Sequence, residues 1–239
     1  MGLRNLNKAN DVTQEQFNQF FAIQNLNTFE NLYLLSSNDD PKQELFNSLK
    51  NDLKKANKLV FIASDPNDNI KMDKYVKELI KYFKKLDIKE FEKIDNRITK
   101  FVAIKHIQNT DVIFLMGGDP IKQLEYLKEL EFNTLISDFK GTIIGVSAGA
   151  MNLATNAFCS KEKEDGESWL YKGLGIVNVT VDPHFDINNK IQTEEFVNTK
   201  LEIIGLPDGS FIKIDKYGTK NIYGTYYIKE KNKIMSKID

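Results

Sequence analysis

The chain has 239 residues, of which 34 are acidic and 33 basic, and its formal net charge is -1. This balance gives no reason to expect nucleic acid or an anionic membrane surface as a partner. The single cysteine, Cys159, excludes an internal disulfide framework, and no apolar stretch approaches the roughly 20 residues that cross a bilayer. The N-terminal segment is polar and lacks the apolar centre of a secretory signal. We therefore expect a soluble, cytoplasmic protein.

The first segment, residues 1–28, is rich in Asn and Gln and contains one short amphipathic piece at 17–23. It is typical of an N-terminal arm that precedes a folded core. We expect residues 29–239 to form a single catalytic α/β domain, because a chain of this length buries one full core.

Short apolar runs alternate with lysine-rich amphipathic stretches after the arm. The predicted strands are 31–37, 58–64, 111–117 and 141–147, and the predicted helices are 72–86 and 120–130. This alternation is typical of a mostly parallel sheet between two layers of helices, in which ligands bind at the carboxyl ends of the strands. The C-terminal segment differs, because short strands and the turn residues Pro207, Asp208, Gly209 and Gly224 predict a C-terminal β-hairpin.

The strongest chemical signal is the sequence Gly145-Val146-Ser147-Ala148-Gly149, which directly follows the strand at 141–147. Small residues on both sides of a serine permit the sharp turn of a nucleophile elbow, and a helix is predicted to follow over 151–158. The alternative is a tight packing turn in which Ser147 only caps that helix.

A serine hydroxyl needs a base to become a nucleophile, and the chain has two histidines. His184 follows an apolar strand, and Pro183 would stop a helix there, so the imidazole is expected at a strand end. His106 lies in a lysine-bearing amphipathic segment and is expected on the surface of a helix. We therefore predict His184 as the base, although an isolated histidine of this kind is also compatible with a hydrogen-bonded core residue.

The carboxylate that orients the base is expected between Ser147 and His184. Four acidic residues are available there: Glu162, Glu164, Asp165 and Glu167. Charge runs on solvated loops are common, and each of these residues also fits such a loop.

A pair of glycines, Gly117 and Gly118, follows another apolar strand and precedes a helix. Paired glycines in this position expose backbone N–H groups that suit an oxyanion hole or a phosphate. Together with Ser147 they predict two walls of one pocket. Two separated histidines and one cysteine do not make a zinc set, so we expect no metal and no cofactor.

The motifs FLMGGDP, GTIIGVSAGAMNLA and VTVDPHF resemble, in the same order, those of the dipeptidase E-like serine peptidases, which include aspartyl dipeptidases and cyanophycinases. The resemblance extends over roughly residues 31–230. It implies a flavodoxin-like three-layer sandwich similar to that of class I glutamine amidotransferases, with serine in place of their cysteine. It also implies that Ser147 is the nucleophile, that His184 is the base, and that Gly117 and Gly118 form the oxyanion hole with the Ala148 amide.

The resemblance further implies Glu162 as the triad acid, because Glu162 occupies the place where aspartyl dipeptidases have their acidic residue. Glu164 and Asp165 remain alternatives. The family's GGN turn is GGD here, so Asp119 is expected to repel a substrate carboxylate, which argues against aspartyl specificity. Arginine is scarce, so a substrate carboxylate would have to bind lysines or Arg97.

The leading hypothesis is a serine peptidase, a dipeptidase or related exopeptidase, that cleaves small peptides through a Ser-His-Glu triad and an acyl-enzyme. Alternatives are an esterase, a catalytically silent ligand-binding protein of the same fold, and a structural homo-oligomer whose arm is the functional part. The expected partner is a small peptide substrate, without nucleic acid or membrane, and the sequence leaves a homodimer open.

Overall fold

The structure, a computed structural model, describes residues 28–37, 43–136, 138–161, 166, 168–230 and 233–238. Residues 1–27 of the predicted arm, including the amphipathic piece at 17–23, lie outside these ranges. The division into an arm and one domain therefore stays a prediction. None of the described helices combines the length and the apolar character needed to cross a membrane.

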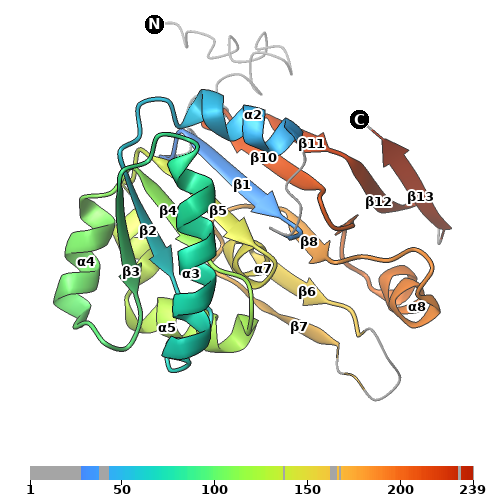
Figure 1. The fold of residues 1–239 in the computed structure, drawn as a ribbon. Helices are drawn as coiled ribbons and strands as arrows, with labels where there is room; N and C mark the ends of the chain where they lie inside the picture. The colour runs from blue at the N-terminus through green and yellow to red at the C-terminus, as the bar shows by residue number, and fades with distance from the viewer. Residues whose placement is uncertain are drawn as a thin grey trace, which may run out of the picture.

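A seven-stranded sheet forms the centre of the fold (Figure 1). Its strand order is β11 (Lys220–Tyr223), β10 (Phe211–Asp215), β1 (Asn31–Leu35), β5 (Thr142–Val146), β4 (Val112–Leu115), β2 (Lys58–Ile62) and β3 (Glu90–Ile94). The strands from β1 to β3 in this order are parallel, and β10 pairs antiparallel with both β1 and β11. The four strands predicted from apolar runs are β1, β2, β4 and β5, so the mostly parallel sheet is confirmed.

Helices cover both faces of this sheet. One face carries α2 (Gln43–Asp52) and α3 (Asn69–Lys84), and the other carries α4 (Lys100–Gln108), α5 (Pro120–Glu129), α6 (Phe132–Ile136) and α7 (Ala148–Leu153). The two faces follow from the strand period of two: Tyr33 and Leu35 pack toward α2 and α3, whereas Leu32 and Leu34 pack toward the other helices. The three-layer sandwich is confirmed.

Two smaller sheets complete the described fold. A four-stranded sheet has the order β13 (Lys233–Ile238), β12 (Thr225–Glu230), β9 (Ile203–Leu206) and β8 (Thr180–Pro183), and β6 (Asn156–Cys159) pairs with β7 (Trp169–Lys172). The antiparallel pairing of β12 with β13 confirms the C-terminal hairpin, whereas β8 and β9 are parallel. Helix α8 (Lys190–Asn198) packs on this sheet through Phe196, which contacts Phe185.

The helix predicted over 151–158 is wrong in its second half. Helix α7 ends at Leu153, and Ala154 adopts an extended backbone that bridges to Val177. The N–H of Thr155 donates to the Val177 carbonyl at 2.9 Å, so strand pairing takes the hydrogen bonds that a longer helix would need. Strand β6 then begins at Asn156.

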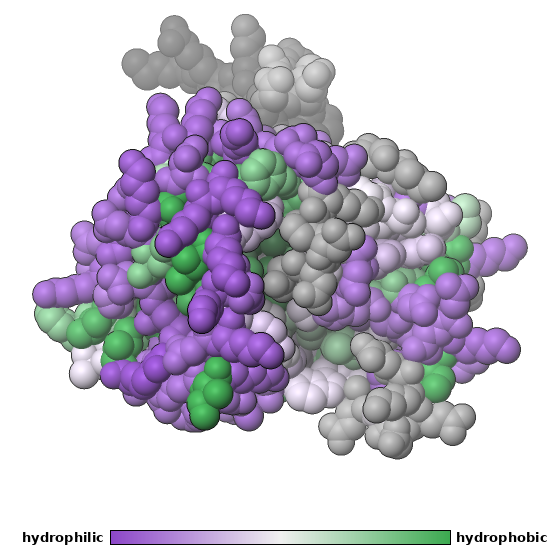
Figure 2. Space-filling model, viewed as in Figure 1, coloured by the Kyte–Doolittle hydropathy of each residue, from purple (hydrophilic) through white to green (hydrophobic). Residues whose placement is uncertain are grey.

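The surface in Figure 2 is mainly hydrophilic, with smaller hydrophobic patches among the charged side chains. Helix α3 shows how such a surface is built, because its buried residues recur at helical spacing: Met72, Val76, Leu79 and Phe83. Its lysines lie on the outer side. This inward face of α3 also borders the pocket described next.

Candidate active site

Ser147 lies at the carboxyl end of β5 on a strained turn. Its backbone angles are φ 48° and ψ -108°, which a residue with a side chain rarely adopts, and its N–H donates to the Leu35 carbonyl at 2.9 Å. Ser147 occupies the N-cap position of α7, yet its hydroxyl makes no capping hydrogen bond. The alternative that Ser147 is only a helix cap is therefore wrong.

The two glycines of the turn have a packing role. A Cβ at Gly149 would lie 2.4 Å from the Leu115 carbonyl oxygen, and a Cβ at Gly145 would lie 2.7 Å from the backbone of Gly149. Both distances are far below van der Waals contact, so α7 lies against β4 and β5 only with glycine at both positions. This close packing directs Ser147 outward at the edge of the sheet.

His184 contacts Ser147. Its Nε2 atom lies 3.0 Å from the Ser147 hydroxyl oxygen, and its Nδ1 atom lies 2.6 Å from a carboxylate oxygen of Asp208. When Nδ1 carries the proton and donates to Asp208, Nε2 is left to accept the proton of the Ser147 hydroxyl. His184 directly follows β8 and also has a positive φ of 57°.

Parallel pairing of β8 with β9 brings the histidine and the aspartate together. Pro183 is in register with Leu206, so the residues that follow each strand, His184 and Asp208, leave the sheet at the same edge. Their side chains keep 40% and 63% of their accessible surface, so this part of the site is open to solvent.

Ser36 connects this pair to the central sheet. Its hydroxyl is fully buried, accepts a hydrogen bond from the His184 N–H at 2.8 Å, and lies 2.8 Å from the Leu206 carbonyl and 3.3 Å from Asp208 Oδ1. A hydroxyl has one hydrogen, so it donates to one of these two acceptors at a time. Ser36 follows β1 directly and thus fixes the backbone of the base relative to the strand beside Ser147.

Asp208 is the carboxylate that contacts His184, and sequence reasoning did not name it as a site residue. The predicted acid Glu162 and its alternatives Glu164, Asp165 and Glu167 lie outside the described residues. From the sequence, Asp208 is predicted only as a turn residue, and it does lie in a turn. The sequence contains a pattern that could have indicated Asp208, because Pro207-Asp208 and Pro183-His184 each stand at the end of an apolar run. Nothing in the sequence shows that the two strands pair.

The glycine pair follows β4 and lies beside the nucleophile. Gly118 has φ 142°, and a Cβ at Gly117 would lie 3.4 Å from Cβ of Ser147. The buried Ser64 hydroxyl donates to the Gly117 carbonyl at 2.6 Å. In a trans peptide the C=O and the next N–H point in opposite directions, so this bond directs the Gly118 N–H away from Ser64.

Ala148, the other predicted oxyanion donor, is the first residue of α7. The first N–H groups of a helix have no acceptor within the helix, so the Ala148 amide is available beside Ser147. The Gly118 and Ala148 amides thus come from adjacent parallel strands, β4 and β5, and flank the same hydroxyl.

Asp119 does not act as expected. Its Oδ1 accepts the N–H groups of Ile121 and Lys122, both at 3.0 Å, and so caps α5. It is not among the described residues that line the pocket. The expected repulsion of a substrate carboxylate by Asp119 therefore has no support in this geometry.

Arg97 is also engaged elsewhere, since its guanidinium contacts Asp73 at 2.8 Å and Asp95 at 2.7 Å. Hydrogen bonds from Arg97 and Lys93 hold the pKa of Asp73 well below its usual range. Burial alone would raise the pKa of Asp95, but hydrogen bonds from the same two cations outweigh it, and the pKa is lowered.

His106 lies on α4 and is partly exposed, as expected, with Nε2 3.8 Å from Glu92.

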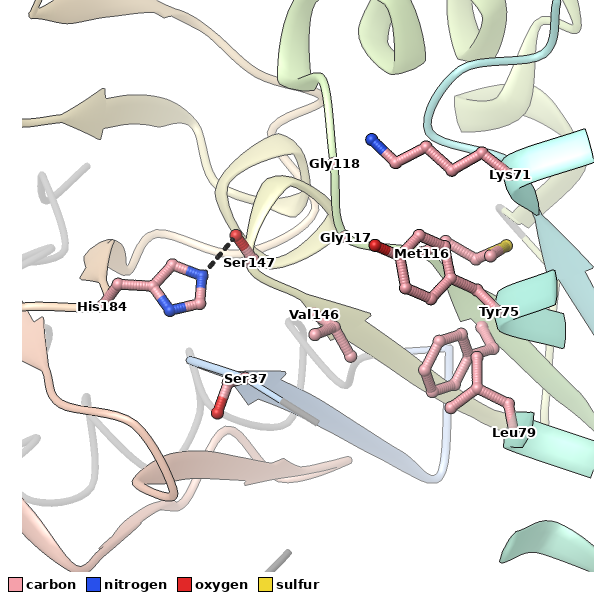
Figure 3. A pocket seen from close by; sticks show the side chains of 11 residues that line it. Ser37, Lys71, Tyr75, Leu79, Met116, Gly117, Gly118, Val146, Ser147 and His184 are labelled. Atoms are coloured by element: carbon pink, nitrogen blue, oxygen red, sulfur yellow. Dashed lines mark hydrogen bonds between the residues drawn. The ribbon is translucent and has the colours of Figure 1, made fainter. Parts of the chain in front are cut away.

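A pocket of about 310 Å³ opens in front of Ser147 and His184 (Figure 3). Gly117 and Gly118 form one wall, and the described lining includes a single cation, Lys71, from the first turn of α3. Across the described ranges no group of three or more His, Cys, Asp or Glu side chains is arranged to hold a metal ion.

A hydroxyl on a strained turn, hydrogen-bonded to an imidazole whose other nitrogen contacts a carboxylate, is the arrangement of hydrolases that use a nucleophilic serine. The parallel sheet carries it at the carboxyl ends of its strands. The sequence profile of peptidase family S51 matches residues 32–222, so the chain belongs to this family of peptidases. The resemblance to dipeptidase E-like peptidases is thereby confirmed.

Two solved structures are similar to this chain. A peptidase from an acI-B1 Actinobacterium has a TM-score of 0.63 at 17% identity, over 87% of this chain and 94% of its own. A peptidase E-type protein from Listeria monocytogenes EGD-e has a TM-score of 0.59 at 20% identity, over 87% of this chain and 98% of its own. At these identities the likeness shows the fold alone. No curated protein matches the sequence closely enough to count as a relative.

Proposed function

We propose that the protein is a serine peptidase that hydrolyses small peptides, with Ser147 as nucleophile, His184 as base and Asp208 as the orienting carboxylate in place of Glu162. The observation that carries this proposal is the continuous contact from Ser147 to His184 at 3.0 Å and from His184 to Asp208 at 2.6 Å. Membership of peptidase family S51 supports amide bonds as the substrate.

The reaction starts when the Ser147 oxygen attacks the scissile carbonyl and His184 Nε2 takes the hydroxyl proton. The imidazolium gives this proton to the leaving amine as the C–N bond breaks, and an acyl-enzyme ester remains on Ser147. Water then attacks the ester, His184 accepts a proton from the water and returns it to the Ser147 oxygen as the ester C–O bond breaks, and the free acid leaves. Asp208 stabilises the imidazolium in both steps without itself becoming protonated.

The negative charge that develops on the carbonyl oxygen needs donors fixed before the reaction begins. The amides of Gly118 and Ala148 serve this role, and the Gly117 residue, also predicted for the oxyanion hole, presents the carbonyl through which Ser64 orients the Gly118 amide. Removal of one such donor typically costs about 10²–10³ in kcat.

The size of the pocket supports a small substrate. A volume of about 310 Å³ is near the lower end for ligand sites and suits one or two amino-acid residues. This supports dipeptidase or related exopeptidase activity rather than cleavage within folded proteins.

The proposal is tested by hydrolysis of a panel of dipeptides by the wild type and Ser147→Ala, with folding matched by circular dichroism. We expect the wild type to cleave at least one peptide and the variant to lose about 10⁴-fold or more in kcat/KM. A fluorophosphonate reagent should label the wild type at Ser147 only. Absence of both hydrolysis and labelling in the wild type would contradict the proposal and favour a silent binding protein.

A further inference from the structure

The pocket in front of Ser147 has two chemically different halves. His184, Ser147 and Ser37 form a polar half, and the other half is formed by apolar side chains from three elements. These are Phe114 and Met116 from the end of β4, Val146 from β5, and Tyr75 and Leu79 from α3. Figure 3 shows Tyr75, Leu79 and Met116 on the side of Ser147 opposite to His184.

The apolar half continues directly from the reactive atoms. Val146 precedes the nucleophile, Met116 precedes the glycine pair, and a Cβ at Gly117 would lie 3.6 Å from Cγ1 of Val146. A group bound between Ser147 and the Gly118 amide would therefore place its neighbouring side chain against these walls. His184 must protonate the leaving amine, so the leaving group lies on the His184 side and the acyl residue lies on the apolar side.

The walls of this half are fixed in the core. Phe114, Met116 and Val146 are each at most 3% exposed and Leu79 is 8% exposed, whereas Tyr75 forms the rim at 46%. Within the ranges that the structure describes, the lining contains no carboxylate, and Lys71 is its one cation. Burial of an apolar side chain is favourable here, and burial of an unpaired charge is costly.

Two further groups limit what else binds. The amine of Lys71 points toward the Gly118 side in Figure 3, where it would repel a cationic side chain. Ser37 is 6% exposed as a residue, and its hydroxyl oxygen is buried without a hydrogen-bond partner among the described residues, so this side of the pocket offers no charge to a bound peptide.

We infer that the acyl residue of the substrate carries an apolar side chain that packs against Leu79, Phe114 and Met116, and that Lys71 disfavours basic residues at this position. This inference rests on the proposed function, since it names the substrate of the same site. It assigns this half of the pocket as the specificity pocket, with Tyr75 as the part of its wall that a substitution can remove without disturbing the core.

The test compares kcat/KM for four dipeptides that share a second alanine and begin with Leu, Met, Asp or Lys. We expect the Leu and Met peptides to exceed the Lys peptide by about tenfold or more, and to exceed the Asp peptide, whose carboxylate Lys71 can pair, by a smaller factor. Tyr75→Ala should lower the ratio of kcat/KM for the Leu peptide to that for the Asp peptide several-fold. A preference for Asp, or a Leu preference that Tyr75→Ala does not alter, would overturn the inference.

The role of Lys71 is tested by Lys71→Glu, with Lys77→Glu as the matched control. Lys77 lies on the same helix, is exposed and does not line the pocket, so both variants change the net charge equally. Lys71→Glu should improve the Lys peptide about tenfold relative to the Leu peptide, and Lys77→Glu should leave the ratio unchanged. Equal effects of the two variants would contradict a local role for Lys71.

Calorimetry measures the binding of the same peptides to Ser147→Ala. It therefore tests the specificity pocket separately from the peptidase activity. Tighter binding of the Leu peptide than of the Asp peptide supports the specificity pocket even if the wild type cleaves neither. Hydrolysis by the wild type without this binding preference supports the peptidase and overturns the inference.

Discussion

The two sides of the site are built in different ways. The turn that carries Ser147 is buried, is formed by one continuous segment, and has glycines at the two positions where helix and sheet backbones touch. His184 and Asp208 are half exposed and exposed, follow two strands of the second sheet, and are held in place by hydrogen bonds to the Ser36 hydroxyl. The first side is specified by local sterics, and the second depends on the pairing of distant strands.

This difference shows where substitutions act. On the nucleophile side a change of backbone shape disturbs the core, because a Cβ at Gly149 would meet the Leu115 carbonyl. On the histidine side a change alters the orientation of one imidazole and leaves the sheet intact. The variants below separate these effects, from the largest expected loss to the smallest.

Joint action of the two sides is tested by His184→Ala, Ser147→Ala and the double variant. A base and its nucleophile act as a unit, so we expect each single variant to lose about 10⁴-fold or more in kcat, and the double variant to lose no more than the worse single. Steady-state kinetics on one peptide measures all three. Additive losses would contradict the hydrogen-bonded pair.

Ser36→Ala tests the connection between the sides. The variant leaves the His184 N–H without its buried acceptor, so kcat should fall about 10- to 100-fold and stability by about 1–3 kcal/mol. Ser210→Ala is the matched control, because Ser210 is also buried and donates to the Thr225 carbonyl at 2.7 Å without contacting His184. The rate at which the fluorophosphonate reagent labels Ser147 is measured in both variants. An equal loss in the two would mean that Ser36 has only a structural role.

The same contrast explains what could be predicted from the sequence. The parallel strands, the glycine pair and the Ser147 turn each depend on one local pattern, and the structure has them where they were expected. The contact of Asp208 with His184 depends on the register of β8 with β9, which no local pattern shows. Glu162 was inferred from its place in the chain and not from a contact. The end of α7 was missed because the Thr155 N–H donates a hydrogen bond to the Val177 carbonyl. Local helix propensity contains no information about a partner so distant in the chain.

Ser64→Ala tests the oxyanion hole on the nucleophile side. Without the bond to the Gly117 carbonyl the Gly118 peptide can rotate, so we expect kcat to fall about tenfold with little change in KM. An increase in KM at constant kcat would instead assign Ser64 to substrate binding.

The smallest effect is expected at residues that do not line the pocket, in the ion cluster of Asp95 with Arg97 and Lys93. The lowered pKa of Asp95 means that its stabilising effect is fully present above the unfolded pKa of about 4 and is lost as pH falls through the folded value. Asp95→Asn should therefore lower the free energy of unfolding at pH 7 by about 1–3 kcal/mol and by less at pH 2, with activity at pH 7 unchanged. Urea unfolding at both pH values measures this, and a difference that grows toward pH 2 would contradict it.

We propose that Asp208, which follows a strand of the second sheet, is the carboxylate that orients His184. Asp208→Asn and Glu162→Gln each replace one carboxylate by its amide, and their kcat/KM values on the same peptide decide between them. We expect Asp208→Asn to lose about a hundredfold or more and Glu162→Gln to stay within about threefold of the wild type. A large loss in Glu162→Gln with an active Asp208→Asn would contradict this account and restore the acid predicted from the sequence.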